Sequence, residues 1–191
     1  MKPFKYTPEW YADEYHAGLK DPKYVIDPRT SHPERDAACL RDLDVSAGQN
    51  MLVAGCGGGD NFWLLDKEFG CRQQMWGIDF SGTAVDFCNR YFPWVAATVG
   101  DVSEMPYDNN AFDIVLAMDI TEHLPFDIYL FFLFEMRRVL RPGGRAAVLP
   151  GMTRRPEHIN LLPLDLVERH LRKARFEVVT RKPEWVIVRK P

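Results

Sequence analysis

Residues 51–59 of this chain read MLVAGCGGG, and this stretch decides the fold. Four apolar residues that run into glycines are typical of a buried β-strand that meets a tight turn. Glycine suits such a turn because it adopts positive φ angles and lets a ligand approach the backbone closely. A strand, a glycine turn and a following helix hold nucleotide-like ligands against a parallel sheet. The alternative is an ordinary loop that contains four glycines.

An acidic residue after the next apolar stretch supports the ligand interpretation. Asp79 ends the segment MWGID at 75–79, about twenty residues beyond Gly59,. A carboxylate at this point can accept hydrogen bonds from both hydroxyls of a ribose. Ser81 is well placed to cap the next helix, so we expect Asp79 to be free for a ligand. The alternative is that Asp79 itself caps that helix.

The spacing of the glycines separates two classes of nucleotide ligand. Dinucleotide-binding folds prefer the pattern G-x-G-x-x-G. Here the glycines stand at Gly55, Gly57 and Gly59, and Asp60 occupies the position where the last one would be needed. The pattern therefore argues against a nicotinamide dinucleotide.

Strand-like and helix-like segments alternate along the rest of the chain. Such alternation predicts an α/β fold: a doubly wound, Rossmann-like, seven-stranded, mostly parallel sheet with an antiparallel last strand. Residues 1–33, rich in proline, tyrosine and charge, are expected to form an N-terminal arm or lid, and residues 34–191 a single domain. The expected strands are 51–54, 75–79, 95–99, 113–118, 145–149, 176–181 and 185–189, and the expected helices are 8–18, 34–43, 60–69, 82–91, 126–140 and one ending near Ala174.

Composition narrows the functional classes. A net charge of −3 over 191 residues offers no basic footprint, so nucleic acid is an unlikely partner,. The absence of a long apolar run or an apolar leader predicts a cytoplasmic protein without a membrane partner. The four cysteines lack C-x-x-C spacing and the five histidines are scattered, so no metal site is expected,. The oligomeric state stays open.

Seven motifs in order give the chain a resemblance to class I S-adenosylmethionine-dependent methyltransferases over about residues 45–190. They are GCGGG at 55–59, Asp79, GDV at 100–102, MPY with AFDIV at 105–115, EHL at 122–124, RVLRPGG at 138–144, and the segment from HIN at 158–160 to ARF at 174–176. The resemblance implies S-adenosyl-L-methionine as cofactor and a methyltransferase domain at 34–191. The cofactor contacts it implies come from Gly55, Cys56, Gly57, Gly59, Asp79 and Phe80, and, beside the adenine, from Asp101 and Val102.

One position departs from the family pattern. The family often carries an acid two residues before the first glycine, where this chain has Val53. That acid usually supports the methionine end of the cofactor, so the anchor must lie elsewhere or be absent. Asp119 is a candidate, because a carboxylate would pair with the ammonium group; a solvated residue at the strand end is the alternative.

The resemblance implies direct in-line displacement at the methyl carbon, a reaction that depends mainly on positioning. His123, after the fourth strand, is the first candidate for a general base, since histidine titrates near neutral pH. It can equally be a local packing residue. His158, Arg154 and Arg155 fall in a loop where substrate contacts are usual, although the arginines can also be solvated loop charges,. Tyr11 with Tyr15 can form a lid over the cofactor, and simple packing of the arm is the alternative.

The leading functional hypothesis is methyl transfer to an O or N atom of a small molecule. The short chain leaves little room for an added recognition domain, which favours a small acceptor. Two alternatives remain: a methyltransferase that acts on protein or RNA, and a catalytically inactive scaffold that only binds the cofactor.

Overall fold

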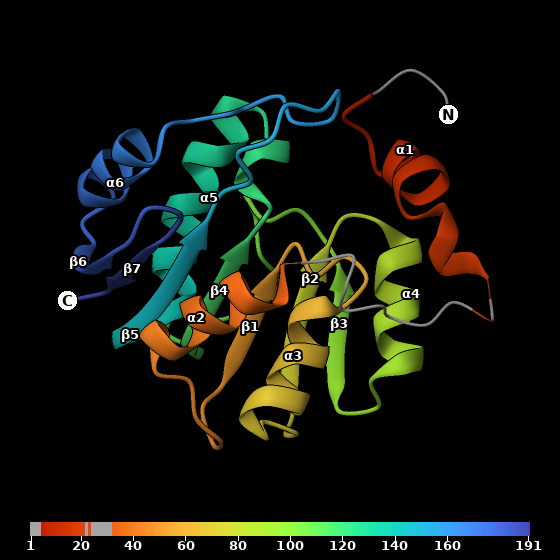
Figure 1. Ribbon diagram of the computed structural model, residues 1–191, viewed down its shortest axis with the longest axis horizontal. Coiled ribbons are helices and arrows are strands. Elements are labelled where there is room, and N and C mark those ends of the chain that lie inside the picture. The colour runs from red at the N-terminus through yellow and green to blue at the C-terminus, as the bar shows by residue number, and fades with distance from the viewer. Residues whose placement is uncertain (1–4, 22, 24–31) are drawn as a thin grey trace.

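A computed structural model describes residues 5–21, 23 and 32–191 of the chain. Its centre is one seven-stranded sheet in the order β3-β2-β1-β4-β5-β7-β6 (Figure 1). All pairs are parallel except those of β7, which runs antiparallel to both β5 and β6. The predicted doubly wound sheet with an antiparallel last strand is thereby confirmed. The strands are β1 Met51–Ala54, β2 Met75–Asp79, β3 Val95–Val99, β4 Phe112–Met118, β5 Leu140–Leu149, β6 Glu177–Arg181 and β7 Val186–Arg189.

Helices cover both faces of the sheet, because the side chains of its strands alternate between two apolar clusters. Met51 and Val53 of β1 pack with α2, α3 and α4, whereas Leu52 and Ala54 belong to the cluster that contains α5 and α6. Figure 1 shows α2 and α3 in front of the sheet and α5 behind β4 and β5. The helices are α2 Pro33–Leu43, α3 Asp60–Phe69, α4 Gly82–Tyr91, α5 Phe126–Val139 and α6 Leu164–Lys173, with a 3₁₀ turn η4 at Thr121–His123.

The order of the strands reverses beside β1, and this reversal fixes where a ligand can lie,. From β1 the chain winds outward through β2 and β3, then returns to add β4 and β5 on the other side. The loops that follow β1 and β4 therefore diverge at the carboxyl edge of the sheet, which is where open α/β sheets bind ligands.

The N-terminal arm is less regular than expected. In place of one helix over 8–18, the structure has three short pieces: α1 Pro8–Trp10, a π-helical turn η1 Tyr11–Tyr15 and a 3₁₀ turn η2 Ala17–Lys20. The wide turn closes with the N–H of His16 donating to the Tyr11 carbonyl at 2.7 Å. In this π-helical turn Tyr11 packs against the main domain. The spacing of residues within the arm does not predict that contact.

Strand β5 starts earlier than the predicted residue 145. Leu140 already pairs with Phe112, and Arg145 pairs with Ile114, so residues 141–144 bulge out between two registered positions. Gly143 carries the bend with a φ of 79°,. The Pro-Gly-Gly segment is therefore a bulge within the strand rather than a turn before it. Within the described residues, no helix is both long and apolar enough to cross a bilayer.

Candidate active site

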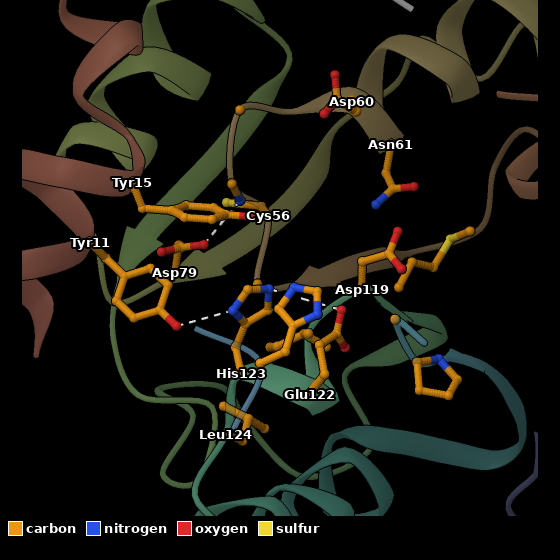
Figure 2. Close-up of a pocket in the computed structure, with 18 of the residues that line it drawn as sticks. Tyr11, Tyr15, Cys56, Asp60, Asn61, Asp79, Asp119, Glu122, His123 and Leu124 are labelled. Carbon is orange, nitrogen blue, oxygen red and sulfur yellow. Dashed lines mark hydrogen bonds and ion pairs between the residues drawn. The ribbon is translucent and has the colours of Figure 1, made fainter. Parts of the chain in front are cut away.

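A cavity of about 640 Å³ opens at the carboxyl edge of β1, β2 and β4 (Figure 2). Its walls come from the loops after these strands, from α2, and from the N-terminal arm. Every residue predicted to bind the cofactor lines it except Gly59, and the lining includes the catalytic candidate His123. The predicted residues in the wall are Gly55, Cys56, Gly57, Asp79, Phe80, Asp101, Val102 and Asp119.

The glycine loop after β1 is shaped by backbone angles that other residues adopt rarely. Gly55 and Gly57 have φ angles of 67° and 47°,. A Cβ on Gly55 would lie 2.5 Å from the side chain of Ile120. Gly59 also has a positive φ, but a Cβ there would run into the Phe92 ring. Gly59 thus closes the turn and packs against Phe92, while Gly55 and Gly57 face the cavity.

Asp79 connects the two loops that flank the cavity. One carboxylate oxygen accepts from the Ser81 N–H at 2.9 Å and the other from the Gly57 N–H at 3.0 Å. Ser81 caps α4 as predicted, accepting from the Ala84 N–H at 3.4 Å. The expectation that this cap leaves Asp79 free is corrected, because the carboxylate bonds both loops. Each oxygen retains a second lone pair for a ligand hydroxyl.

The arm forms the roof of the cavity with aromatic rings. Tyr11 and Tyr6 lie over Phe80, with ring centroids 4.8 and 5.2 Å away. The hydroxyl of Tyr11 is 3.1 Å from Nδ1 of His123, so the roof contacts the floor directly (Figure 2). Burial raises the pKa of Tyr15 to about 12, so its phenol stays protonated at neutral pH. His16 is buried in the same wall.

Asp119 stands at the end of β4 and faces a cation from α2. Arg35 makes a two-pronged ion pair with the Asp119 carboxylate, and its Nε also donates to Asp36 at 2.7 Å. The Asp119 side chain is 41% exposed, so a ligand in the cavity can still reach it. Sequence reasoning missed Arg35, since nothing in the spacing of residues links it to a loop 84 positions away.

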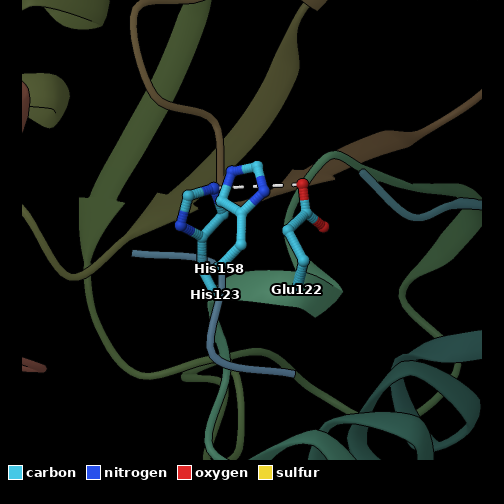
Figure 3. A group of neighbouring side chains, drawn as sticks. All are labelled: Glu122, His123 and His158. Carbon is cyan, nitrogen blue, oxygen red and sulfur yellow. Dashed lines mark ion pairs between the residues drawn. The ribbon is translucent and has the colours of Figure 1, made fainter. Parts of the chain in front are cut away.

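Two histidines and a carboxylate meet on the floor of the cavity. Each of Glu122, His123 and His158 contributes a ligand-type atom, and these atoms lie within 4.8 Å of one another (Figure 3). The two imidazole centroids are 4.7 Å apart. Hydrogen bonds from Asn160 to the carbonyls of Glu122 and Thr121, at 3.0 and 3.3 Å, hold the two loops together. The histidines looked scattered because the fold, rather than local spacing, pairs them.

Burial changes the charge of this cluster. It raises the pKa of Glu122 to about 7, and the backbone amides of Gly151 and Glu122 oppose that shift,. Burial, followed by the nearby His158 and His16, lowers the pKa of His123 to about 3. His123 is neutral at pH 7 and is a weaker base than the unperturbed histidine assumed from sequence. Of the loop arginines named above, Arg155 lines the cavity while Arg154 is exposed outside it.

The sheet order, the positive-φ loop and the hydrogen-bonded acid at the end of β2 define the class: a doubly wound α/β protein with a cavity at its switch point,. Residues 51–144 match the methyltransferase domain family. Over this segment, just under half of the chain, the protein is similar to S-adenosylmethionine-dependent methyltransferases, whose cofactor is S-adenosyl-L-methionine.

Individual relatives are more distant. Over 113 residues the chain is 34% identical to demethylmenaquinone methyltransferase of Staphylococcus aureus strain MRSA252, which covers 58% of this chain and 46% of that protein. The chain spans about half the length of the curated relatives it matches.

Two solved structures have the same fold. The 4+2 cyclase SpnF matches with a TM-score of 0.71 at 21% identity, covering 91% of this chain and 75% of that one. Phosphoethanolamine N-methyltransferase 2 of Haemonchus contortus, solved with S-adenosyl-L-methionine, has a TM-score of 0.67 at 22% identity and covers 91% and 44%. At such identities the likeness shows the fold alone, and the cyclase illustrates that one fold hosts different reactions.

Proposed function

We propose that this protein transfers a methyl group from S-adenosyl-L-methionine to an O or N atom of a small molecule. The observation that carries the proposal is the pairing of the Gly57 N–H with Asp79 at the lip of the cavity. This bond holds a glycine loop and a buried acid side by side, and we propose that the ribose lies against both,. The match of residues 51–144 to the methyltransferase domain family supports the same reaction.

The adenosyl group is proposed to lie along β1 and β2. Asp79 accepts from the ribose hydroxyls, and Phe80, Asp101 and Val102 surround the adenine. Asp101 accepts from the N–H and hydroxyl of Ser103 at 2.8 and 2.7 Å, which fixes its carboxylate at the cavity wall. A fixed carboxylate can accept from the exocyclic amino group without first losing rotamer freedom.

The methionine end of the cofactor is proposed to meet the ion pair on the opposite side. A zwitterionic amino acid carries one carboxylate and one ammonium group, and Arg35 with Asp119 offers the complementary charges,. Arginine binds carboxylates in a planar two-pronged geometry. Arg35 can therefore exchange the Asp119 carboxylate for the carboxylate of the cofactor with little change in its own orientation. This pair would supply the anchor that the family often places where this chain has the buried Val53.

The acceptor is proposed to enter between the aromatic roof and the floor that contains His123. The walls offer Tyr11, Tyr15 and Phe80 for packing and the cluster at Glu122 for polar contact. Such a mixture suits a compact molecule with an apolar body and a few polar atoms. By its name, the relative from Staphylococcus aureus methylates demethylmenaquinone, which supports a small-molecule acceptor here.

Calorimetry with S-adenosylhomocysteine, followed by methyl transfer from labelled cofactor to a panel of small hydroxy and amino compounds, tests the proposal. Stoichiometric binding together with a labelled small-molecule product supports it. Binding with label appearing only in protein or RNA replaces the small-molecule acceptor with a macromolecular one. Binding without transfer to any acceptor favours the inactive scaffold, and no binding at millimolar cofactor refutes the assignment.

A further inference from the structure

We propose that Glu122, His123 and His158 form a binding site for one divalent transition-metal ion on the floor of the cavity. The three side chains come from η4 and from the loop between β5 and α6, and Figure 3 shows both rings beside the carboxylate. Two imidazoles and one carboxylate are a ligand set that zinc, iron, cobalt and manganese accept, in contrast to the all-oxygen sites of magnesium and calcium.

The Glu122 carboxylate lacks a partner for one of its oxygens. The residue is 1% exposed, and its Oε2 has no hydrogen-bond donor among the described residues. Oε1 lies 3.9 Å from Nε2 of His123, which is beyond hydrogen-bond distance,. A buried carboxylate oxygen without a donor is costly to the fold. A cation bound by this carboxylate would offset the cost of keeping the group buried and charged.

Both histidines are oriented as metal ligands usually are. Nδ1 of His158 lies 2.6 Å from the carbonyl oxygen of Thr153, which can only accept. Nδ1 therefore carries the proton, and Nε2 keeps its lone pair for the cluster. Histidine ligands typically donate their second nitrogen to a carbonyl in this way. His123 has the Tyr11 hydroxyl at Nδ1, and that oxygen can accept as well as donate, so its Nε2 is also available.

The spacing of the cluster leaves room for an ion. Ligand atoms bonded to one metal at about 2.0–2.2 Å lie about 3.0–3.5 Å from one another. The three donors, within 4.8 Å of one another, need to close by roughly 1 Å, which side-chain rotations supply,. Three protein ligands leave positions open toward the cavity. If the proposed function holds, an oxygen of the acceptor occupies one of them, and the metal lowers the pKa of a bound hydroxyl.

The test is a titration of Co²⁺ into the full-length chain, prepared without a histidine tag and freed of metal by a chelator. Visible d–d absorption and calorimetry report binding, and competition by Zn²⁺ and Mg²⁺ reports selectivity. We expect one equivalent of Co²⁺ to bind, to be displaced by Zn²⁺, and to persist at an equal concentration of Mg²⁺. Glu122→Gln and His158→Ala should each weaken Co²⁺ binding about tenfold or more. His170→Ala removes a histidine on α6 outside the cluster and should leave Co²⁺ affinity unchanged.

Several results overturn the metal site. They are no saturable Co²⁺ or Zn²⁺ binding by the unmodified protein, binding that survives both cluster variants, and equal loss in His170→Ala. Thermal unfolding and S-adenosylhomocysteine binding, measured for each variant, identify any variant that misfolds. The Co²⁺ titration of the unmodified protein tests the metal site without relying on the variants. Cofactor binding without Co²⁺ binding removes the metal site and keeps the methyltransferase proposal, whereas Co²⁺ binding without cofactor binding does the reverse.

Discussion

At the scale of single residues, the cavity depends on an acid that has two tasks. The Asp79 carboxylate accepts hydrogen bonds from the Gly57 and Ser81 N–H groups. We propose that it also accepts from the ribose hydroxyls. Asp79→Asn keeps the size of the side chain but exchanges one acceptor oxygen for a donor. We expect it to weaken S-adenosylhomocysteine binding by about 1–3 kcal/mol, through the loss of charge-assisted hydrogen bonds. Calorimetry measures this directly.

Asp165→Asn is the matched control for that substitution, because Asp165 is an exposed partner of Arg181 away from the cavity. It should leave cofactor affinity unchanged. Equal affinity of the Asp79→Asn variant and the unmodified protein would remove the ribose role from this residue.

A second prediction separates backbone strain from steric clash in the glycine loop. Gly48 and Gly55 both have positive φ angles. A Cβ added at Gly48 would meet no described atom within 4 Å, whereas a Cβ added at Gly55 would lie 2.5 Å from Ile120. Gly48→Ala should cost about 1–2 kcal/mol of unfolding free energy, from the left-handed backbone alone. Gly55→Ala should cost at least about 1 kcal/mol more, because overpacking adds to it. Urea unfolding measures both, and equal losses would mean that Ile120 moves aside freely.

Positions in the cavity wall could be predicted from sequence where one short motif marked them, although the roles of these residues stay predictions. Gly55, Gly57, Asp79, Phe80, Asp101 and Val102 line the cavity because each lies at or just after the end of a strand, and strand ends meet at one edge of a parallel sheet,. Glu122 was visible within the EHL motif, but its burial was not. Arg35 reaches the cavity only through long-range packing, so no local pattern identifies it. His158 was expected in a loop that contacts substrate, but its place beside His123 was not predicted.

At the scale of elements, the N-terminal arm is the part of the fold that the cofactor should affect most. The arm lines the cavity with Tyr6, Tyr11, Tyr15 and His16. It is built only of short helical turns. Short elements with few neighbours open readily. Bound S-adenosylhomocysteine should therefore slow hydrogen exchange of the amides in η1 and η2, as a lid would require.

Mass spectrometry of exchanged peptides measures this protection. The hairpin of β6 and β7 lies at the far end of the sheet order and provides the internal control. Protection of the hairpin to the same extent would indicate a global effect, and unchanged exchange in the arm would exclude the lid.

Element boundaries were predicted well wherever apolar periodicity and capping agreed. Strands β1, β2 and β3 and helices α3 and α4 have the predicted bounds, and α5 ends one residue early. The two misjudged segments, the arm and the start of β5, are both set by contacts with other elements. Leu140 extends β5 because it pairs with Phe112, and Pro-Gly-Gly is accommodated as a bulge.

At the scale of the whole molecule, a ligand that binds only the folded state should raise stability with the logarithm of its concentration above the dissociation constant. A ligand at one hundred times its dissociation constant adds about 2.7 kcal/mol. For a chain of 191 residues this amounts to roughly 5–10 °C in the unfolding midpoint,. We expect S-adenosylhomocysteine to give such a shift and NAD to give none, since the glycine spacing disfavours a dinucleotide. Scanning fluorimetry measures both, and a larger shift with NAD would contradict the cofactor assignment.

The sequence by itself determined the sheet, its doubly wound order and the strand-end residues that line the cavity. These features follow from local patterns, because alternating apolar segments and glycine turns act within a few residues of one another. Only the tertiary structure decided the rest: the arm over the cavity, the pairing of Arg35 with Asp119, and the meeting of Glu122 with His123 and His158. Such contacts join residues far apart in the chain, and their energies depend on burial, which the order of residues does not display.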